Sequence, residues 1–383
     1  CSFFIFLICK NEFQNLNKFS LSCIWFALFI FIYHENSFFG GVAGQDIINE
    51  GYQPASFGVL FYAGIYLFII RKYFYAVFII CLSASFHPTY ILHSGFILLG
   101  FLIYFISIKQ FKLLFRAIFF YSIFILPITI FIVLNFLLID RELILIGQKI
   151  LVERIAHHAL IDNWFSYKDL ISVFVYIIAL LFIYDNKKIF TPLMIFGVLS
   201  IFLSTLQFFT TNQSLALAFP WRASVFLIPL SSMIIVSFFI NKFSLKKFNL
   251  NIIGTLFFLT LFSFFFLKNH FVKNLNQHFY KELELTNEIN KHYDLIQRIL
   301  IPVELSHIRM NTGLPIFIDW KHHAFKYDEL IEWKNRVNLA QKFFETNDFD
   351  KRLIILNDIN QIEEISHILI DKKKLNKDCE NLI

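Results

Sequence analysis

The sequence predicts an α-helical membrane protein of about nine or ten spans, with a small C-terminal α/β domain outside the cytoplasm. Three observations lead to this fold class. Hydrophobic residues make up 57% of the 383 residues and charged residues only 16%, which is less charge than a soluble domain of this length carries. The apolar residues come in blocks long enough to cross a bilayer, separated by short polar breaks. Beyond about residue 269 the chain turns polar, so a different kind of domain is expected there.

Ten apolar blocks are expected to form the spans, although several are shorter than the ~20 residues that a perpendicular helix needs. Short spans are tolerated where a helix lines a cavity or where the bilayer thins. One block is long and contains Pro127, which predicts a tilted and kinked helix. The blocks are 1–9, 19–33, 55–70, 73–86, 89–108, 113–138, 170–184, 189–209, 222–240 and 250–267.

Basic residues fall in alternate loops between these blocks. One set of loops carries twelve Lys and Arg residues, whereas the loops 34–54, 87–88 and 210–220 carry none. The positive-inside rule places the basic set in the cytoplasm, so the polar tail lies outside. The first block then runs inward, and at least one span is expected to precede Cys1. The twelve are Lys10, Lys18, Arg71, Lys72, Lys109, Lys112, Arg116, Lys187, Lys188, Lys242, Lys246 and Lys247.

Two domains are predicted. Residues 1–268 form the transmembrane domain, and its outer loop 139–168 contains a stretch, 143–155, whose apolar residues recur at helical spacing. Such a helix is expected to lie flat on the membrane surface. Residues 269–383 form the outer domain, in which an alternation of helices and strands is typical of a small α/β fold with parallel pairing. The expected helices are 270–300 and 327–345, and the expected strands are 316–318, 353–356 and 368–370.

Cysteine spacing and loop composition predict no cofactor. The five cysteines show neither disulfide nor metal-ligand spacing, and there is no Gly-rich phosphate loop. We therefore expect no metal and no nucleic-acid partner, and the lipid bilayer is the predicted surrounding.

The polar residues that stand out lie in the outer loops. Gln45 and Asp46 follow three glycines in the loop 34–54. Small residues let backbone approach a ligand closely, and these two side chains could bond a sugar. The alternative is an ordinary glycine turn with solvated side chains.

Two further candidates sit at helix breaks. His87 precedes Pro88 after a short span, and a histidine at membrane depth is often functional. The alternative is a helix-hairpin turn with a capping histidine. Arg222 follows Trp221 at the outer start of a span, where it can pair with a lipid-linked phosphate. The alternative is an arginine that snorkels beside an interfacial tryptophan.

The outer loop 139–168 and the tail hold the remaining candidates. Arg154, His157 and His158 precede Trp164, and together they could grip a phosphate and act as acid or base. The alternative is an interfacial segment with a Trp anchor. In the tail, Asp319 and Lys321 follow an expected strand, where α/β sites gather, although a structural ion pair would give the same pattern.

Five strings of the sequence together resemble a family of poorly characterised bacterial multi-pass membrane proteins. The layout of many spans and an outward C-terminal domain also resembles that of the C-type (GT-C) membrane glycosyltransferases. Those enzymes place an essential carboxylate in the first outer loop, whereas the predicted topology puts Asp46 in the second. The strings are GVAGQDIINEGYQPASFGV, SASFHPTYIL, ERIAHHALIDNWF, AFPWRASVFLIPL and RMNTGLPIFIDWKHHAFKYDELIEWKNRV.

The resemblance implies a glycosyltransferase-like activity on the outer face of a bacterial inner membrane. The donor would be a polyprenyl-phosphate-linked sugar. A carboxylate, with Asp46 as the candidate, would act as base, while Arg154 and Arg222 with His157 and His158 would hold the leaving phosphate. Three alternatives stay open: an oligosaccharide (O-antigen-type) polymerase, a transporter with His87 and Arg222 along its path, and a non-catalytic assembly protein.

Overall fold

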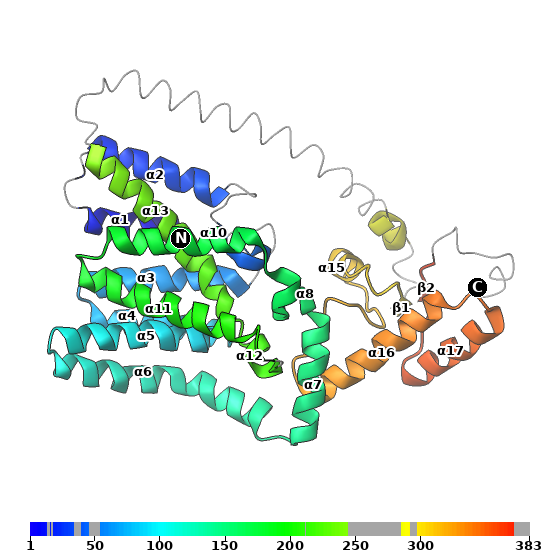
Figure 1. Ribbon diagram of the computed structural model, residues 1–383. Coiled ribbons are helices and arrows are strands. Elements are labelled where there is room, and N and C mark those ends of the chain that lie inside the picture. Colours follow the sequence, from blue (N-terminus) through cyan, green and yellow to red (C-terminus); the bar gives the residue numbers. More distant parts are fainter. Residues whose placement is uncertain are drawn as a thin grey trace. The chain divides into compact units, whose positions relative to one another are not determined.

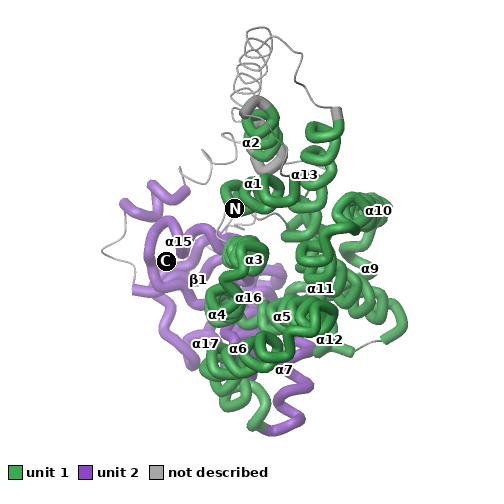
Figure 2. The backbone as a smooth tube through the Cα atoms, turned by 90° about the vertical axis from the view of Figure 1, so that its left-hand side faces the viewer, with its two compact units in different colours: residues 1–139, 151–250 green, residues 140–150, 251–383 purple. Residues whose placement is uncertain are grey.

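The computed structural model describes residues 1–13, 16, 18–33, 40–45, 54–210, 212–243, 285–291 and 297–370. The chain divides into two compact units, drawn in different colours in Figure 2. Unit 1 comprises Cys1–Ile139 and Leu151–Leu250, and unit 2 comprises Asp140–Ile150 and Asn251–Ile383. The predicted domain boundary after residue 268, the predicted span 250–267 and most of the predicted helix 270–300 lie outside the described residues.

Unit 1 is built of helices, and nine of the ten predicted apolar blocks lie in its described part, each containing one. Loops and short helical turns connect them at both ends (Figure 1). The elements in chain order are α1 (Ser2–Glu12), α2 (Lys18–Tyr33), η1 (Val42–Gly44), η2 (Pro54–Gly58), α3 (Val59–Ile69), α4 (Tyr73–Phe86), α5 (Tyr90–Ser107), α6 (Phe111–Ile132), η3 (Val133–Leu137), α8 (Ala156–Ala159), α9 (Ile161–Trp164), α10 (Tyr167–Phe182), α11 (Lys187–Leu206), α12 (Gln213–Leu217), η4 (Pro220–Ala223) and α13 (Ser224–Phe243). The predicted surface helix is α7 (Arg141–Arg154), whose last turn belongs to unit 1.

Four helical stretches of the described chain are long and apolar enough to cross a membrane: Tyr90–Ser107, Phe111–Leu137, Lys187–Leu206 and Gln213–Lys242. The surface of α6 supports this reading. Phe115 and Phe119 are 67% and 60% exposed, and further large apolar residues along the helix, from Phe111 to Phe131, are also exposed. Water solvates such a continuous apolar surface poorly, whereas lipid accommodates it. The protein is therefore a helical protein embedded in a membrane, and the full number of spans stays a prediction.

Aromatic packing fixes the helices that carry the site. The ring of Phe61 in α3 lies edge-on to Phe226 in α13, with centroids 5.3 Å apart. The Tyr62 hydroxyl donates to the Phe226 carbonyl at 2.9 Å. Tyr90, at the start of α5, contacts the same ring at 5.6 Å. The first turns of α5 and α13 are thereby held against α3, which places the residues preceding both helices near one another.

The basic turns gather at one end of unit 1. The connections α3–α4 and α5–α6 are tight turns in which Arg71 and Lys109 adopt the left-handed conformation, with φ of 65° and 55°. The Lys188 ammonium, in the first turn of α11, contacts the backbone carbonyl of Ile69 beside the first of these turns. The short helices α8 and α12 lie at the opposite end (Figure 1). This separation is the one that the alternating charges of the sequence predict.

In the described C-terminal part of unit 2, the helices α15, α16 and α17 and a short helix over 285–291 accompany a minimal parallel pairing. Strand β1 (Ile299–Leu300) pairs with β2 (His367–Ile368), and Ile316 forms a further parallel bridge to Ile299. The predicted helix 327–345 is α16 (Tyr327–Glu345). The other helices are α15 (His307–Thr312) and α17 (Phe349–Ile362). So few paired residues leave the α/β class of this domain a prediction.

The predicted strand 353–356 is wrong, because these residues lie inside α17. The Asp348 side chain accepts a hydrogen bond from the Lys351 amide at 3.1 Å and so starts a helix. Ile355 and Ile359 are buried one turn apart. The apolar run therefore follows the helical period, which a four-residue window cannot distinguish from a buried strand.

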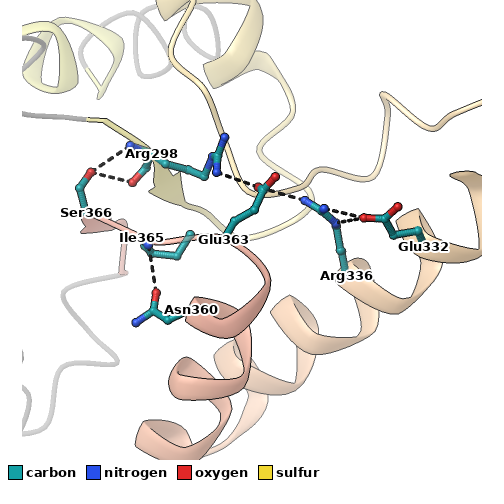
Figure 3. A network of polar contacts seen from close by, with 7 residues as sticks. All are labelled: Arg298, Glu332, Arg336, Asn360, Glu363, Ile365 and Ser366. Atoms are coloured by element: carbon teal, nitrogen blue, oxygen red, sulfur yellow. Dashed lines mark hydrogen bonds and ion pairs between the residues drawn. The ribbon is translucent and has the colours of Figure 1, made fainter.

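Ion pairs join the helices and strands of unit 2 (Figure 3). The Glu363 carboxylate accepts from Arg298 at 3.1 Å and from Arg336 at 3.0 Å. Arg336 also pairs with Glu332 one turn earlier in α16, at 2.5 Å. Next to these ion pairs the Ser366 hydroxyl donates to the Arg298 carbonyl at 2.8 Å, at the start of the β1–β2 pairing. These interactions thus connect α16, the end of α17 and the two strands to one another.

Candidate functional site

The candidate site lies at the end of unit 1 that is opposite to the basic turns, where helices stop and short polar segments meet. Arg222 is its central residue. It lies in η4 and is only 7% exposed. Its Nη1 donates to the Thr89 hydroxyl at 3.1 Å, and its guanidinium carbon lies 4.2 Å from the centroid of the Phe219 ring. A buried guanidinium that rests on an aromatic face, with no carboxylate of the described residues paired to it, is suited to a negatively charged ligand.

Backbone geometry explains how Arg222 is turned inward. Phe219 adopts the left-handed conformation with φ of 47°, immediately before Pro220. Such a conformation costs a non-glycine residue about 1–2 kcal/mol. Pro220 disfavours the right-handed helical region for the residue before it, so the helix α12 cannot continue into η4. The resulting reversal brings the Arg222 side chain onto the ring of Phe219.

Thr89 links Arg222 to two histidines. Its hydroxyl, which accepts from Arg222, donates to Nδ1 of His87 at 2.8 Å. Its carbonyl accepts from Nδ1 of His93 at 3.0 Å. Because Nδ1 of His87 accepts hydrogen bonds from the hydroxyl and the amide of Thr89, the proton of His87 lies on Nε2. Burial, and secondarily the charge of Arg222, lower the pKa of His87 to about 4, so its imidazole is neutral at physiological pH.

His158 forms the other half of the site. Its Nε2 lies 3.3 Å from the amide nitrogen of Gln45, and its carbonyl accepts from the indole of Trp221 at 3.1 Å. Because an amide NH₂ is a donor, the His158 proton lies on Nδ1. Burial, then the neighbouring His157, lower the pKa of His158 to about 4. Burial, then the charge of Arg154, also lower the pKa of His157.

The glycine-containing turn that presents Gln45 is fixed to α13. The amide of Gly41 donates to the Gln45 carbonyl at 2.9 Å, which closes the turn. The amide of Val42 donates to the Ser224 hydroxyl at 2.9 Å. A Cβ atom on Gly41 would lie 2.6 Å from the side chain of Val225, so only glycine allows this approach. Gln45, 5% exposed, is thereby held in place beside His158.

Three buried donors in this region have no hydrogen-bond partner among the described residues. They are Nε of Arg222, Nδ1 of His158 and the indole nitrogen of Trp164. The Trp164 and Trp221 rings lie 5.5 Å apart, and Trp221 precedes Arg222 in the chain. Native proteins rarely leave buried donors unused. A cluster of unused donors around a guanidinium is complementary to an anion with several acceptor oxygens, such as a phosphate.

An apolar cavity of about 280 Å³ adjoins these residues, between α10, α11 and α13. Trp164 and Trp221 form part of its wall, so the same two indoles border the polar cluster and the cavity. Asp169 is the one acidic residue of the described lining. Its carboxylate accepts from the amide and the hydroxyl of Ser166, at 2.6 and 2.9 Å, and caps the start of α10.

The structure brings together most of the residues that the sequence singled out in the outer loops. Arg154 joins them through its effect on the two histidines that follow it. Asp46 lies outside the described residues. The residues that come together are Gln45, His87, His157, His158, Trp164, Trp221 and Arg222.

Asp319 and Lys321 belong to unit 2, where Asp319 makes hydrogen bonds that hold a turn in place. Its carboxylate accepts from the Lys321 amide at 2.8 Å and from Nδ1 of His322 at 2.8 Å, and its carbonyl accepts from the Trp333 indole at 3.0 Å. Asp319 is buried, whereas the Lys321 side chain is exposed. Asp319 therefore fixes the turn that follows Ile318. No group of three or more His, Cys, Asp or Glu side chains among the described residues is placed to hold a metal.

Sequence reasoning missed Thr89, His93 and Phe219. Thr89 is an ordinary residue in a turn, and nothing local connects it to Arg222. His93 offered a signal, because it lies inside an apolar block, where histidine is costly. Its Nε2 is buried and has no hydrogen-bond partner among the described residues.

One family profile matches part of the chain. Residues 281–340 match a domain of unknown function (DUF6798). The matched residues belong to unit 2 and include α15 and most of α16. No curated protein and no solved structure matches the chain significantly.

Proposed function

We propose that the protein is a membrane glycosyltransferase-like enzyme that uses a polyprenyl-phosphate-linked sugar on the outer face of a bacterial inner membrane. The observation that carries the proposal is the buried guanidinium of Arg222 beside unused donors of His158 and Trp164. A phosphate ester would pair with the guanidinium and accept from these N–H groups. The exposed apolar surface of α6 supports a substrate that is itself held in the bilayer.

The proposed reaction is a direct displacement at the anomeric carbon. The acceptor hydroxyl forms a new C–O bond as the C–O bond to the phosphate breaks, and its proton passes to a carboxylate base. Asp46 is the carboxylate that the sequence suggests for this role. Negative charge grows on the leaving phosphate, and donors already aimed at that position stabilise the transition state.

The histidines have a specific part in this proposal. A low pKa keeps His87 and His158 neutral at pH 7. A neutral imidazole can donate one N–H bond to the phosphate without becoming an ion pair that would hold the product tightly. His158 would donate through Nδ1, and His87 would orient Arg222 through Thr89.

The test is to replace Arg222 by Lys. Lysine keeps the charge but cannot supply two parallel donors from a planar group. We expect Arg222→Lys to lose tenfold or more of the transfer of labelled sugar from polyprenyl-phosphate donors to membrane acceptors, about 1.4 kcal/mol of transition-state stabilisation. Full transfer at an equal protein level would contradict the proposal.

The matched control is Arg116→Lys. Arg116 lies on the exposed surface of α6 and has no role in the site. This variant tests whether an exchange of arginine for lysine by itself affects membrane insertion. We expect normal transfer and normal membrane insertion for this variant.

A further inference from the structure

The apolar cavity next to the site has a definite length and direction. Its outer end is formed by Trp164 and Trp221, and it extends along α10 from Asp169 to Tyr176. Seven residues of helix correspond to about 10 Å. Helix α10 packs chiefly on α13, and α11 chiefly on α5, whereas α10 and α11 contact each other little, which leaves space for the cavity between them.

Tyr176 closes the inner end of the cavity. Its hydroxyl donates to the carbonyls of Leu193 and Met194 in α11, at 3.0 and 3.2 Å. Its ring lies against Gly197, where a Cβ atom would be 2.2 Å from the ring. The cavity is therefore a blind slot that begins at the tryptophans and stops at this contact.

The lining is apolar even where hydroxyl-bearing residues contribute. Ser200 and Ser172 donate to helix carbonyls one turn earlier, at 2.7 and 3.4 Å. The Asp169 carboxylate accepts hydrogen bonds from the amide and the hydroxyl of Ser166. The Thr205 hydroxyl likewise donates to the Ile201 carbonyl, and Ser204 is the lining residue whose hydroxyl has no partner among the described residues. One free hydroxyl is less than the two to four polar partners that a buried water needs, so the slot suits a hydrocarbon occupant.

The side of the slot is bordered by exposed apolar residues. Leu170 is 49% exposed and Ile201 is 36% exposed, and Phe165 and Phe208 on the same rim are also uncovered. In a membrane-embedded protein, such a rim meets lipid chains. A long chain can therefore enter the slot from the side while its head group remains at the outer end.

We propose that the slot binds the phosphate-proximal part of the isoprenoid chain of the sugar donor, with Trp164 and Trp221 at the junction between chain and phosphate. The proposal rests on the proposed function for the identity of the phosphate head group. The two indoles serve both parts of the ligand, since their faces border the slot and the Trp164 N–H is an unused donor. Indoles are suited to such a boundary because one edge is polar and the rest apolar.

The first experiment measures how binding depends on chain length. The full chain is placed in lipid nanodiscs, and inorganic phosphate and isoprenyl monophosphates of increasing length compete with a diazirine-bearing isoprenyl phosphate. At equal concentrations in the bilayer, competitors with longer chains are expected to bind more strongly, through packing against the slot, until the chain outgrows the slot and the gain levels off. Mass spectrometry should find the cross-links on α10 and α11. Cross-links spread over α6, or equal competition by an ordinary phospholipid, would overturn the proposal.

The second experiment fills the slot. Ser204 lines it, and its hydroxyl has no partner among the described residues, so Ser204→Phe should occupy the space. We expect at least a tenfold loss of the chain-dependent affinity with unchanged competition by inorganic phosphate. Ser122→Phe, on the exposed surface of α6, is the matched control and should change neither.

These results distinguish a failure of the proposed function from a failure of the proposal that the slot binds the chain. A lipid phosphate that binds in the slot but is never a sugar donor would contradict the proposed function and leave the slot intact. Unchanged chain dependence in Ser204→Phe would overturn the slot. If that variant does not fold, the cross-linking map of the unaltered protein decides.

Discussion

At the scale of single residues, Thr89 is the side chain on which the arrangement of the site depends. One hydroxyl accepts from Arg222 and donates to His87, and the carbonyl of the same residue holds His93. Three polar side chains thus each have a hydrogen bond to the same small residue. Removal of one partner from such a network leaves the other groups unpaired, and this costs more than the lost hydrogen bond itself.

Thr89→Val tests this dependence. Valine keeps the shape and removes the hydroxyl, so Nη1 of Arg222 loses its partner and Nδ1 of His87 keeps only the hydrogen bond from the amide of residue 89, at 3.4 Å. We expect the free energy of unfolding to fall by roughly 1–3 kcal/mol, measured by thermal unfolding in nanodiscs. Thr129→Val is the control, because Thr129 is exposed and its hydroxyl bonds only to its own helix. Equal stability of the two variants would contradict the role of Thr89.

The histidines predict how stability changes with pH. His87 and His158 have their pKa lowered from 6.5 to about 4. The unfolded chain binds a proton near pH 6.5, whereas the folded chain does so only near pH 4. Stability is therefore fully present above pH 6.5 and decreases as the pH falls from there to about 4.

The check is a series of melting temperatures between pH 7.5 and pH 4.5, with an expected steady decline below about pH 6.5. His87→Gln should flatten part of the decline, because glutamine does not titrate. A melting temperature that stays constant over the whole range would show that these imidazoles are not buried in their neutral form.

At the scale of elements, close helix contacts depend on glycine at defined positions. Gly197 in α11 lies against the ring of Tyr176 in α10, and Gly100 in α5 lies against Pro192 in α11. In a bilayer, helices associate by packing and not by exclusion of water, so small residues at the interface matter more than apolar area.

Gly197→Ala and Gly95→Ala make a matched pair. A Cβ at Gly197 would be 2.2 Å from the Tyr176 ring, whereas at Gly95 the nearest described atom outside its own helix is 3.7 Å away. We expect Gly197→Ala to cost about 1–3 kcal/mol through overpacking. Gly95→Ala should be neutral or stabilising by up to ~1 kcal/mol, because alanine favours a helix. Thermal unfolding of both variants is the measurement, and similar melting temperatures would argue against the α10–α11 contact.

The elements also show what a sequence can predict. The helix over 327–345 was predictable because its buried residues repeat at helical spacing over many turns. The misassigned run 353–356 is too short to reveal a period, and the deciding residue, Asp348, lies outside it. Periodicity therefore predicts long elements well and short apolar runs poorly.

For the site, the sequence indicates which residues are unusual and not how they pair. Arg222, His87 and Gln45 were recognisable because polar residues stand out at the ends of apolar blocks. Thr89 pairs with Arg222 across 133 positions of the chain. No local pattern encodes that contact, since it results from the packing of α5 and α13 on α3.

At the scale of the whole molecule, charge and apolar surface together define an orientation. The basic turns lie at one end of unit 1 and the candidate site at the other. From this separation the positive-inside rule predicts that the site, and the domain that follows α13 and the predicted last span, lie outside the cytoplasm.

Two reporters test this orientation. A reporter that is active only in the cytoplasm, fused after Ile383, should stay silent. Lys109→Cys, in a background without the native cysteines, should react with a membrane-impermeant maleimide only after the membrane is opened. An active fusion, or labelling of intact cells at position 109, would show that the topology is the reverse of the predicted one and would exclude a site on the outer face.

Phe219 carries a consequence for attempts to engineer this protein. Glycine would relax its left-handed backbone and recover about 1–2 kcal/mol. The Phe219 ring is buried in the cluster that contains Trp221, however, and deleting a buried phenylalanine side chain costs about 3–5 kcal/mol, so Phe219→Gly should destabilise the protein. The same exchange removes the ring on which the Arg222 guanidinium rests. Stability and ligand recognition therefore depend on the same ring, and relief of backbone strain at this position is not a route to a more heat-resistant protein.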